Sequence, residues 1–520
     1  MRAPIAARRS TVITAVLSLA LMLIALVQLF RPLAPLVITN EHLNDIPLTV
    51  YTPRSADAPA PVVVIAHGFA GSRQLMGQFA VTLARAGYTA ITFDFPGHGQ
   101  STTPLQGGLL DREERNEQLE ATLDTVVAEA RQLGNGQVAL LGHSMGSQAV
   151  TSYAQAHPQI AATVAVSLGS ASVTATSPRN LLLLTGALES SLQPTAQNII
   201  DVAAGGAGEL ATTYGSFTDG SARRAVFPGA VEHIGVLFSP TSLDESLRWF
   251  DAAFNRATPD QPYLDGRVIW VALLFLGAVG LFWSLVTIAG RNMQLADVPT
   301  RSANMRRQSA LLWWVVALAA AILAPLLLRL LPVQDVLPIL VGGPLSFFFL
   351  VYGVVTLLGL VLLRRTWGDQ KGLASNHYGV VVLLALFTFG YVLLTFGLPA
   401  QQFLLNYFPP TQRWWVFVAV FVAMLPYFLG DEWLTRSVHA PRGAYAITKV
   451  FFVFALAAAI ALDQRLFFLV LVAPVFILYF VIYGLFSGWL FRATATPLPG
   501  ALANAAIFAW FVAAVFPLVG

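Results

Sequence analysis

The sequence of 520 residues contains no cysteine. Without a thiol, the chain can form no disulfide bond, has no thiolate nucleophile and offers no cysteine ligand to a metal ion. Charged residues are also scarce, at 11% of the chain, whereas 56% of the residues are hydrophobic and the mean hydropathy is +0.66. A composition as apolar as this excludes an ordinary soluble protein.

Lysine is absent from residues 31–267, where 13 arginines and 21 acidic residues give a net charge of −8. Beyond Arg267 only six acidic residues remain, and long apolar runs continue to the end of the chain. The isoelectric point is near 9.2, but the basic residues outside the acidic region lie mainly in short loops beside apolar runs, so no nucleic-acid partner is predicted. We therefore predict an N-terminal anchor over residues 1–30, a folded domain over residues 31–267 and a membrane domain over residues 268–520.

Apolar runs of membrane-spanning length occur before and after the acidic region. A helix needs about 20 apolar residues to cross a hydrocarbon core of about 30 Å. One run lies near Thr11–Phe30, and we predict that it is an uncleaved signal anchor, because it is long and no clear cleavage site follows it. Eight more predicted spans bring the count to nine, and they lie near Val268–Ala289, Ala310–Leu331, Leu337–Leu363, Tyr378–Leu398, Trp414–Gly430, Ile447–Leu462, Leu466–Phe491 and Gly500–Val519.

The placement of basic residues predicts the orientation of these spans. With the N-terminus in the cytoplasm, 14 basic residues lie in cytoplasmic segments, among them Arg2, Arg301, Arg306 and Lys371, and three lie at outer ends. The acidic domain is then extracytoplasmic, and the protein is predicted to be a multi-pass protein of the plasma (inner) membrane. The predicted spans carry almost no ionisable residue at mid-depth, which disfavours a transporter.

Segments typical of strands and helices alternate through residues 31–267. This alternation predicts an α/β domain with a doubly wound, mostly parallel sheet, followed by an all-α membrane bundle. The expected strands are Pro35–Asn40, Pro47–Thr52, Pro61–Ala66, Thr89–Phe93, Gln137–Leu141, Ile160–Leu168, Asn180–Thr185 and Arg223–Pro228, and the expected helices are Arg73–Ala86, Leu109–Leu133, Ser147–Ala156 and Leu243–Phe254.

A possible nucleophile follows the strand Gln137–Leu141. The residues Gly142-His143-Ser144-Met145-Gly146 form a G-x-S-x-G pattern between a predicted strand and a predicted helix. The glycines allow a turn that is too tight for larger side chains, and the turn exposes the serine hydroxyl. We therefore predict that Ser144 is the nucleophile of a serine hydrolase and that His143 packs within the turn.

Histidine is the base that a serine hydroxyl requires, because its unperturbed pKa of about 6.5 suits proton transfer near neutral pH. Of the histidines in residues 31–267, only His233 follows the last predicted strand, in a loop of small residues before a helix. The chain order serine, acid, histidine is the order expected of a fold of this type, so His233 is the predicted base. The alternative is a histidine in a surface loop.

A carboxylate must hold the histidine ring in the correct tautomer. Glu189 follows the strand Asn180–Thr185 and is the predicted acid, with a solvated loop glutamate as the alternative. Asp201 and Asp219 are its rivals. Glu232 adjoins the histidine, but neighbouring side chains diverge, so it is poorly placed to orient the ring.

Two backbone N–H groups are needed to stabilise the negative charge that develops on a substrate oxygen. Met145, directly after the nucleophile, is one predicted donor. Phe69, in the glycine-containing loop after the strand Pro61–Ala66, is the other. The alternative for this loop is a plain turn between strand and helix.

The loop His67-Gly68-Phe69, the turn Asp94–Ser101, the segment Gly142–Gly146 and the late Glu189 and His233 together resemble the α/β-hydrolase superfamily, in its serine esterase or lipase-like branch, over about Leu36–Phe254. The resemblance implies hydrolysis of an ester, thioester or amide through an acyl-enzyme on Ser144, with no cofactor and no metal. It argues against the dehalogenase and epoxide-hydrolase branches, which use an aspartate nucleophile. Only ten residues, Gly169–Pro178, occupy the place where relatives often insert a lid, so an open cleft is expected, or one covered by Ser190–Gly220 or by the membrane.

Three functions remain open from the sequence. The leading one is a membrane-integrated serine hydrolase that cleaves an ester, with a lipid or an envelope acyl ester as its substrate. The second is an acyltransferase that uses the same residues, and the third is a transporter or scaffold that carries a hydrolase-like domain without activity. The lipid bilayer and a lipid-like ester are the expected partners. The membrane bundle presents the substrate or serves as an anchor or oligomerisation module, and the oligomeric state stays open.

Overall fold

The computed structural model describes residues 5–55, 59–108, 111–170, 172–293, 307–367, 378–437 and 439–520. Arg2, Arg301, Arg306 and Lys371, which support the predicted orientation, lie outside these residues. The contacts divide the chain into two compact units. The sheet unit comprises Ile24–Ala272, Pro399–Pro410 and Pro517–Gly520, and the helical unit comprises Met1–Leu23, Leu273–Leu398 and Thr411–Phe516.

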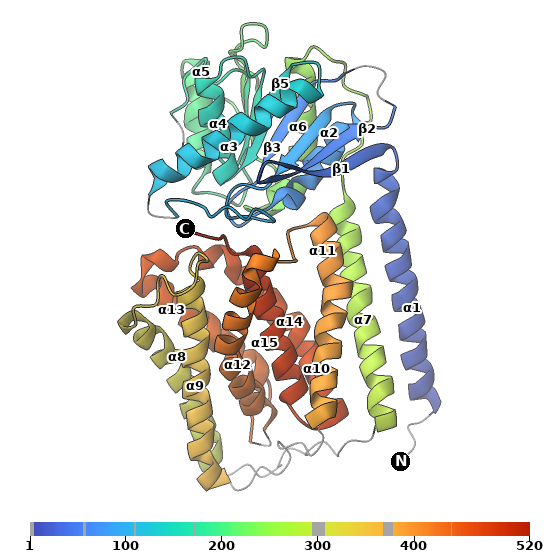
Figure 1. Cartoon of the computed structure of the whole chain (residues 1–520), viewed down its shortest axis with the longest axis vertical. Helices are drawn as coiled ribbons and strands as arrows, with labels where there is room; N and C mark the ends of the chain where they lie inside the picture. The colour runs from blue at the N-terminus through green and yellow to red at the C-terminus, as the bar shows by residue number, and fades with distance from the viewer. Residues whose placement is uncertain are drawn as a thin grey trace. The chain divides into compact units, whose positions relative to one another are not determined.

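The sheet unit is built on one sheet of eight strands in the order β1-β2-β4-β3-β5-β6-β7-β8 (Figure 1). The strand β2 pairs antiparallel with β1 and with β4, and all other pairs are parallel. The sheet is therefore mostly parallel, as the sequence predicts. The strands are β1 (Leu36–Leu43), β2 (Ile46–Pro53), β3 (Val62–Ala66), β4 (Thr89–Phe93), β5 (Val138–His143), β6 (Thr163–Val166), β7 (Leu181–Leu184) and β8 (Arg223–Val226).

Helices cover both faces of this sheet. Val63 and Ile65 of β3 pack on one face with α2 (Gly77–Arg85) and α6 (Pro240–Ala253). Val62 and Val64 point to the other face, toward α3 (Arg112–Leu133) and α4 (Met145–Ala156). The helix α5 (Gln193–Ala204) covers the same face over β6, β7 and β8. Burial on both faces explains why the central strands are continuous apolar runs, rather than alternating apolar and polar residues.

Local signals explain some of the helix boundaries in the sheet unit. The Asp111 side chain accepts hydrogen bonds from the N–H groups of Glu113 and Glu114, both at 3.1 Å, and so caps the start of α3. The helix α5 was not among the predicted elements, although Pro194 in its first turn and Gly205 after its end, with φ +68°, are typical helix boundaries. The predicted helix Arg73–Ala86 starts as a 3₁₀ turn, Arg73–Met76, before α2.

The segment Pro399–Pro410 belongs to the sheet unit although it lies far along the chain. The Asn406 backbone N–H donates to the Ser72 hydroxyl at 2.9 Å, and its side-chain amide donates to the Gly99 carbonyl at 3.2 Å. The Gln100 side chain in turn donates to Asn406 Oδ1 at 2.6 Å. A sequence-distant segment therefore packs against the loops that follow β3 and β4.

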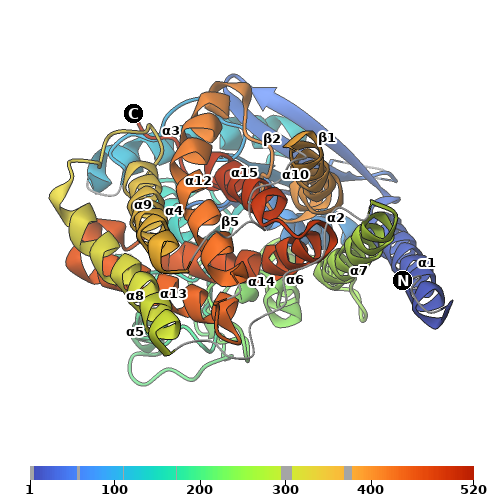
Figure 2. The same cartoon turned by 90° about the horizontal axis from the view of Figure 1, so that it is seen from below.

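Nine helices among the described residues are long and apolar enough to cross a membrane, the number that the sequence predicts. In the helical unit, α12 packs against α9 and α15, and α8 packs against α9 and α13; Figure 2 gives the end-on view. The helix α10 continues through a π-helical turn, Leu393–Gly397, into α11. Eight of the nine are the single helices α1 (Ile5–Phe30), α7 (Arg267–Met293), α8 (Arg307–Leu330), α9 (Gly342–Trp367), α12 (Trp414–Arg436), α13 (Ala444–Leu462), α14 (Leu469–Thr494) and α15 (Leu498–Val515). The ninth is formed by α10 (Tyr378–Val392), the π-helical turn and α11 (Leu398–Phe403) together.

The helical unit contains a buried group of charges that the predicted span Trp414–Gly430 omits. The helix α12 continues to Arg436, so Asp431 and Glu432 lie within it and are buried. Lys449 forms an ion pair with Asp431, and Arg436 pairs with Glu432 at 3.0 Å. Each acid thus has a basic partner, as buried charges require. Asp431, Glu432 and Arg436 follow the predicted span Trp414–Gly430, whereas Lys449 lies near the start of the predicted span Ile447–Leu462.

Candidate active site

The turn between β5 and α4 holds Ser144 in a strained conformation, with φ 53° and ψ −118°. The adjacent glycines make this turn possible. A Cβ atom on Gly142 would lie 2.3 Å from the Gly146 carbonyl oxygen, and one on Gly146 would lie 2.5 Å from the carbonyl oxygen of His67. Because neither position tolerates a side chain, the G-x-S-x-G pattern is here a steric requirement of the turn.

The imidazole of His233 lies between Ser144 and Glu189. Its Nε2 atom is 3.0 Å from the Ser144 hydroxyl oxygen, and its Nδ1 atom is 2.6 Å from Glu189 Oε1. These distances suit a proton transfer from Ser144 to His233 and a carboxylate that holds Nδ1–H. The structure therefore brings together three residues that are distant in the sequence. Glu189 lies 45 positions after Ser144, and His233 lies 44 positions after Glu189.

The Glu189 carboxylate is buried and held by three donors. Besides His233, the Ser167 hydroxyl donates to Oε2 at 2.8 Å and the Gly186 N–H donates to it at 2.7 Å. Burial alone would raise the pKa of Glu189, but the hydrogen bonds outweigh it, and the pKa lies below its usual value. Glu189 is therefore charged at neutral pH.

The loops that follow β7 and β8 approach closely at this point. A Cβ atom on Gly186 would lie 2.5 Å from the Val231 carbonyl oxygen and 3.0 Å from Glu189 Oε2. Gly186 thus allows the acid loop to lie against the histidine loop. This close approach is the physical reason why a glycine stands between the strand β7 and Glu189.

The rival carboxylates bond to backbone N–H groups close to them in the chain. Asp201 Oδ1 accepts from the Gly208 N–H at 2.8 Å, and Asp219 Oδ1 accepts from the Ser221 N–H at 2.8 Å. Glu232 accepts from the two N–H groups that follow His233, at 2.7 and 2.8 Å. All three side chains therefore stabilise turns.

The loop after β3 lies directly against the nucleophile. A Cβ atom on Gly68 would be 3.0 Å from Ser144 Cβ, so the backbone that leads into Phe69 passes beside the serine. Met145 is the first residue of α4, directly after Ser144. The two predicted N–H donors thus belong to backbone segments on either side of the nucleophile.

Buried polar contacts hold this loop in place. The His67 ring donates from Nδ1 to the Gly68 carbonyl at 2.7 Å, and its Nε2 accepts from the Phe95 N–H at 3.0 Å. Asp94 accepts from the Arg73 N–H at 2.7 Å and also forms an ion pair with the Arg73 side chain. Asp94 is therefore a structural residue that joins this turn to the loop after β3.

His143 positions the loop of the histidine base. Its Nε2–H donates to the His233 carbonyl oxygen at 2.8 Å, and its ring is buried. Burial, together with the neighbouring His233, lowers the pKa of His143 to about 3. His143 is therefore neutral at physiological pH and acts as a backbone donor.

The neutral state of His143 should make the fold sensitive to acid. The folded-state pKa is about 3, below the ordinary value of about 6.5, so the unfolded chain binds a proton that the folded chain excludes. Stability should fall as pH drops below about 6.5, by about 1.4 kcal/mol per pH unit from this residue alone. We expect His143→Gln to reduce this dependence between about pH 6 and pH 4, measured as the denaturant midpoint of the full chain.

A histidine on the surface provides the control for this measurement. His42 is exposed on β1, and His42→Gln should retain the acid sensitivity of the unmodified chain. Equal pH dependence in His143→Gln and the unmodified chain would show that His143 is not held neutral by burial.

Three contributors to this site were not predicted from the sequence. Ser167 and the Gly186 N–H hold the acid, and Asn406 bonds to the loops after β3 and β4. Ser167 follows the carboxyl end of β6, which is the one signal that could have indicated it. Nothing in the local sequence around Asn406 indicates its contacts.

The eight-stranded, mostly parallel sheet, the strained serine turn and the Ser144–His233–Glu189 contacts give the sheet unit the architecture of an α/β-hydrolase fold. The model of the alpha/beta hydrolase fold matches residues 61–188. This match covers β3 to the loop after β7, including Ser144, and ends before Glu189 and His233.

The chain is also similar to individual proteins over part of its length. The chain is 32% identical over 134 residues to the esterase YjfP of Escherichia coli, which is 25% of this chain and 54% of that protein. The chain thus matches about half the length of this curated relative. Among solved structures, it is similar to TT1662 from Thermus thermophilus, at 14% identity and a TM-score of 0.33 over 43% of this chain and 99% of that one. It is also similar to a monoglyceride lipase from Saccharomyces cerevisiae, at 12% identity and a TM-score of 0.31 over 43% and 97% of the two chains.

Proposed function

We propose that this protein hydrolyses carboxylic esters through an acyl-enzyme on Ser144. The observation that carries the proposal is the continuous contact from the Ser144 hydroxyl to His233 Nε2, at 3.0 Å, and from His233 Nδ1 to Glu189, at 2.6 Å. A serine hydroxyl is a weak nucleophile, and an adjacent oriented base is what activates it.

The reaction follows from the positions of these groups. His233 Nε2 removes the hydroxyl proton as Ser144 Oγ attacks the ester carbonyl carbon, and the negative charge of Glu189 stabilises the resulting imidazolium. The carbonyl oxygen becomes an oxyanion, which the N–H groups of Met145 and Phe69 stabilise. His233 then gives its proton to the leaving alkoxide, so an alcohol departs and an acyl-serine remains.

Water completes the cycle by the same route. His233 takes a proton from water, the resulting hydroxide attacks the acyl carbon, and the collapse of the second tetrahedral intermediate returns the proton to Ser144 Oγ. A carboxylic acid is released. Acyl transfer differs only in this step, where an alcohol or amine replaces water.

We further propose a lipid-like or envelope acyl ester as the substrate. The chain joins the hydrolase domain to helices of membrane-spanning length. The described residues of 169–178 form no helix or strand, so no lid domain is inserted at that point. A site without an inserted lid domain at this point suits a substrate that is large or is held in a membrane.

Product analysis of the purified full chain tests the proposal. A panel of soluble esters and phospholipids in neutral detergent should release carboxylic acid, and a fluorophosphonate probe should modify Ser144, as read by mass spectrometry of its peptide. An added alcohol that captures most of the acyl group would identify an acyltransferase. Absence of both turnover and modification in the folded protein would overturn the enzymatic proposal in favour of a scaffold or transporter.

We propose that residues 31–267 face away from the cytoplasm in the plasma (inner) membrane, because the basic residues of the loops favour a cytoplasmic N-terminus. Protease added to sealed spheroplasts should then digest this domain. Protection that persists until the membrane is lysed would overturn the orientation.

A further inference from the structure

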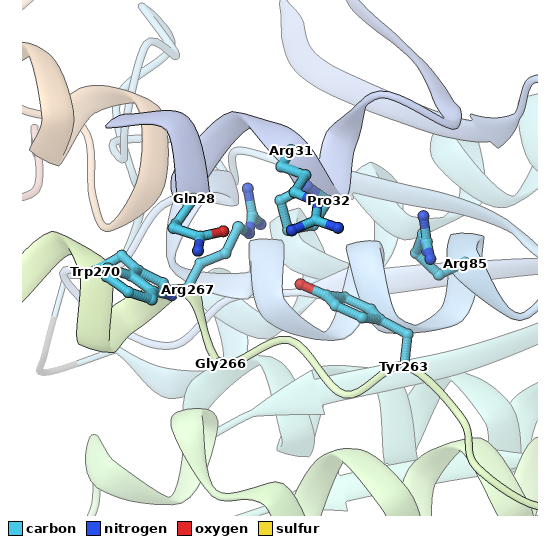
Figure 3. A pocket seen from close by; sticks show the side chains of 8 residues that line it. All are labelled: Gln28, Arg31, Pro32, Arg85, Tyr263, Gly266, Arg267 and Trp270. Carbon is cyan, nitrogen blue, oxygen red and sulfur yellow. The ribbon is translucent and has the colours of Figure 1, made fainter. Parts of the chain in front are cut away.

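A cationic pocket of about 420 Å³ lies in the sheet unit, between the end of α1 and the start of α7 (Figure 3). Arg31, Arg85 and Arg267 contribute guanidinium groups to it, and Tyr263 and Trp270 contribute aromatic rings. The remaining lining residues are Gln28, Pro32 and Gly266.

One of the three arginines is already paired. Arg267 contacts both carboxylate oxygens of Asp265, with Nη2 2.6 Å from Oδ2, and both side chains are buried. The Tyr263 hydroxyl donates to the same carboxylate at 3.2 Å. This pair therefore forms a neutral, rigid wall of the pocket.

The other two arginines differ from Arg267 in their surroundings. Among the described residues, no carboxylate forms an ion pair with Arg31 or Arg85, and both side chains are exposed. The Arg85 guanidinium lies 5.0 Å from the centre of the Tyr263 ring, which holds it over the pocket. Two unpaired guanidinium groups beside one cavity favour an anionic ligand, because Arg binds phosphate oxygens with two parallel hydrogen bonds.

The pocket lies where two candidate membrane spans terminate. The first span covers Arg9–Leu33, the second covers Arg267–Arg291, and the pocket is lined by residues at the end of the one and the beginning of the other. When these helices cross a bilayer, such ends lie at its polar surface, where Trp and Tyr side chains are typical. Basic pockets at helix ends of this kind bind lipid head groups.

This pocket is separate from the candidate active site. Arg85 ends α2, which leads into the amino end of β4, whereas Ser144 follows the carboxyl end of β5. The strands β4, β3 and β5 are parallel, so the two positions lie at opposite edges of the sheet. The pocket is therefore no part of the site that would bind the scissile ester.

We propose that this pocket binds the phosphate of an anionic phospholipid head group. Arg31 and Arg85 donate to the phosphate oxygens, the Arg267–Asp265 pair shapes the wall, and Trp270 contacts the apolar part of the lipid.

Lipid titration of the purified full chain tests this assignment. Native mass spectrometry in a neutral detergent measures the binding of phosphatidylglycerol, with phosphatidylcholine and inorganic phosphate as separate arms. The unmodified chain should prefer phosphatidylglycerol. The double variant Arg31→Gln/Arg85→Gln should bind it at least about tenfold more weakly.

The control variant removes two exposed arginines from another helix. Arg112→Gln/Arg131→Gln, on α3, changes the charge equally and should bind phosphatidylglycerol as the unmodified chain does. Both variants should unfold within about 2 °C of the unmodified chain without lipid, which shows that they are folded. Equal binding of the two lipids, or an equal loss in both variants, overturns the proposal. Displacement of phosphatidylglycerol by an equal concentration of inorganic phosphate also overturns the lipid assignment.

Discussion

Ser144→Ala should lower the turnover number for ester hydrolysis by about 10⁴- to 10⁶-fold, because it removes the hydroxyl that His233 activates. The Ser144 hydroxyl lies 3.0 Å from His233 Nε2, and the replacement removes the oxygen that attacks the substrate. Labelling by a fluorophosphonate probe should be lost together with turnover. Initial rates with a soluble ester and gel fluorescence of the labelled protein measure the two effects.

The matched control for this variant lies on α4, the helix that follows Ser144. Ser152 is exposed on α4, and Ser152→Ala should keep both turnover and labelling. If Ser144→Ala retained full activity while its folding was unchanged, another residue would be the nucleophile and the proposed mechanism would be wrong.

Glu189→Gln should lower turnover by about 10³- to 10⁴-fold, the second largest effect that we expect. The carboxylate accepts from His233 Nδ1 at 2.6 Å, and its charge stabilises the imidazolium that forms when Ser144 loses its proton. A neutral amide of the same size has no charge and can hold the ring in the wrong tautomer. The loss should appear in kcat more than in KM, because the interaction strengthens in the transition state.

The neighbouring glutamate provides the control. Glu232 precedes the base in the chain, but its carboxylate accepts from the N–H groups of Ile234 and Gly235. Glu232→Gln should therefore change turnover by less than about tenfold. A large loss with Glu232→Gln and a small one with Glu189→Gln would reverse the assignment of the acid.

Sequence reasoning predicted the sheet well, because its strands are buried on both faces and read as continuous apolar runs. The strand Thr89–Phe93 has the predicted bounds, whereas Ile160–Leu168 is reduced to Thr163–Val166, since apolar residues continue past the last pairing with β7. The helix α5 was missed because its apolar residues contact the sheet across only a narrow face. The predicted span Trp414–Gly430 ends before the buried charges of α12. Glu432 pairs with Arg436 on the same helix, whereas Asp431 pairs with Lys449 on α13, and a contact between two helices cannot be recognised in one sequence.

The sequence by itself determined the class of fold and the order of the site residues Ser144, Glu189 and His233. The two glycines around Ser144 and the strand–loop spacing are local requirements, and local requirements are visible in a sequence. Only the tertiary structure decided which groups share the site: the Ser167 hydroxyl on the acid, the His143 donor to the histidine loop and the Asn406 contacts with the loops after β3 and β4. The cationic pocket likewise combines Arg31, Arg85 and Trp270 from three separate elements. Such groups meet because distant segments pack together, and the spacing of residues along the chain does not indicate those contacts.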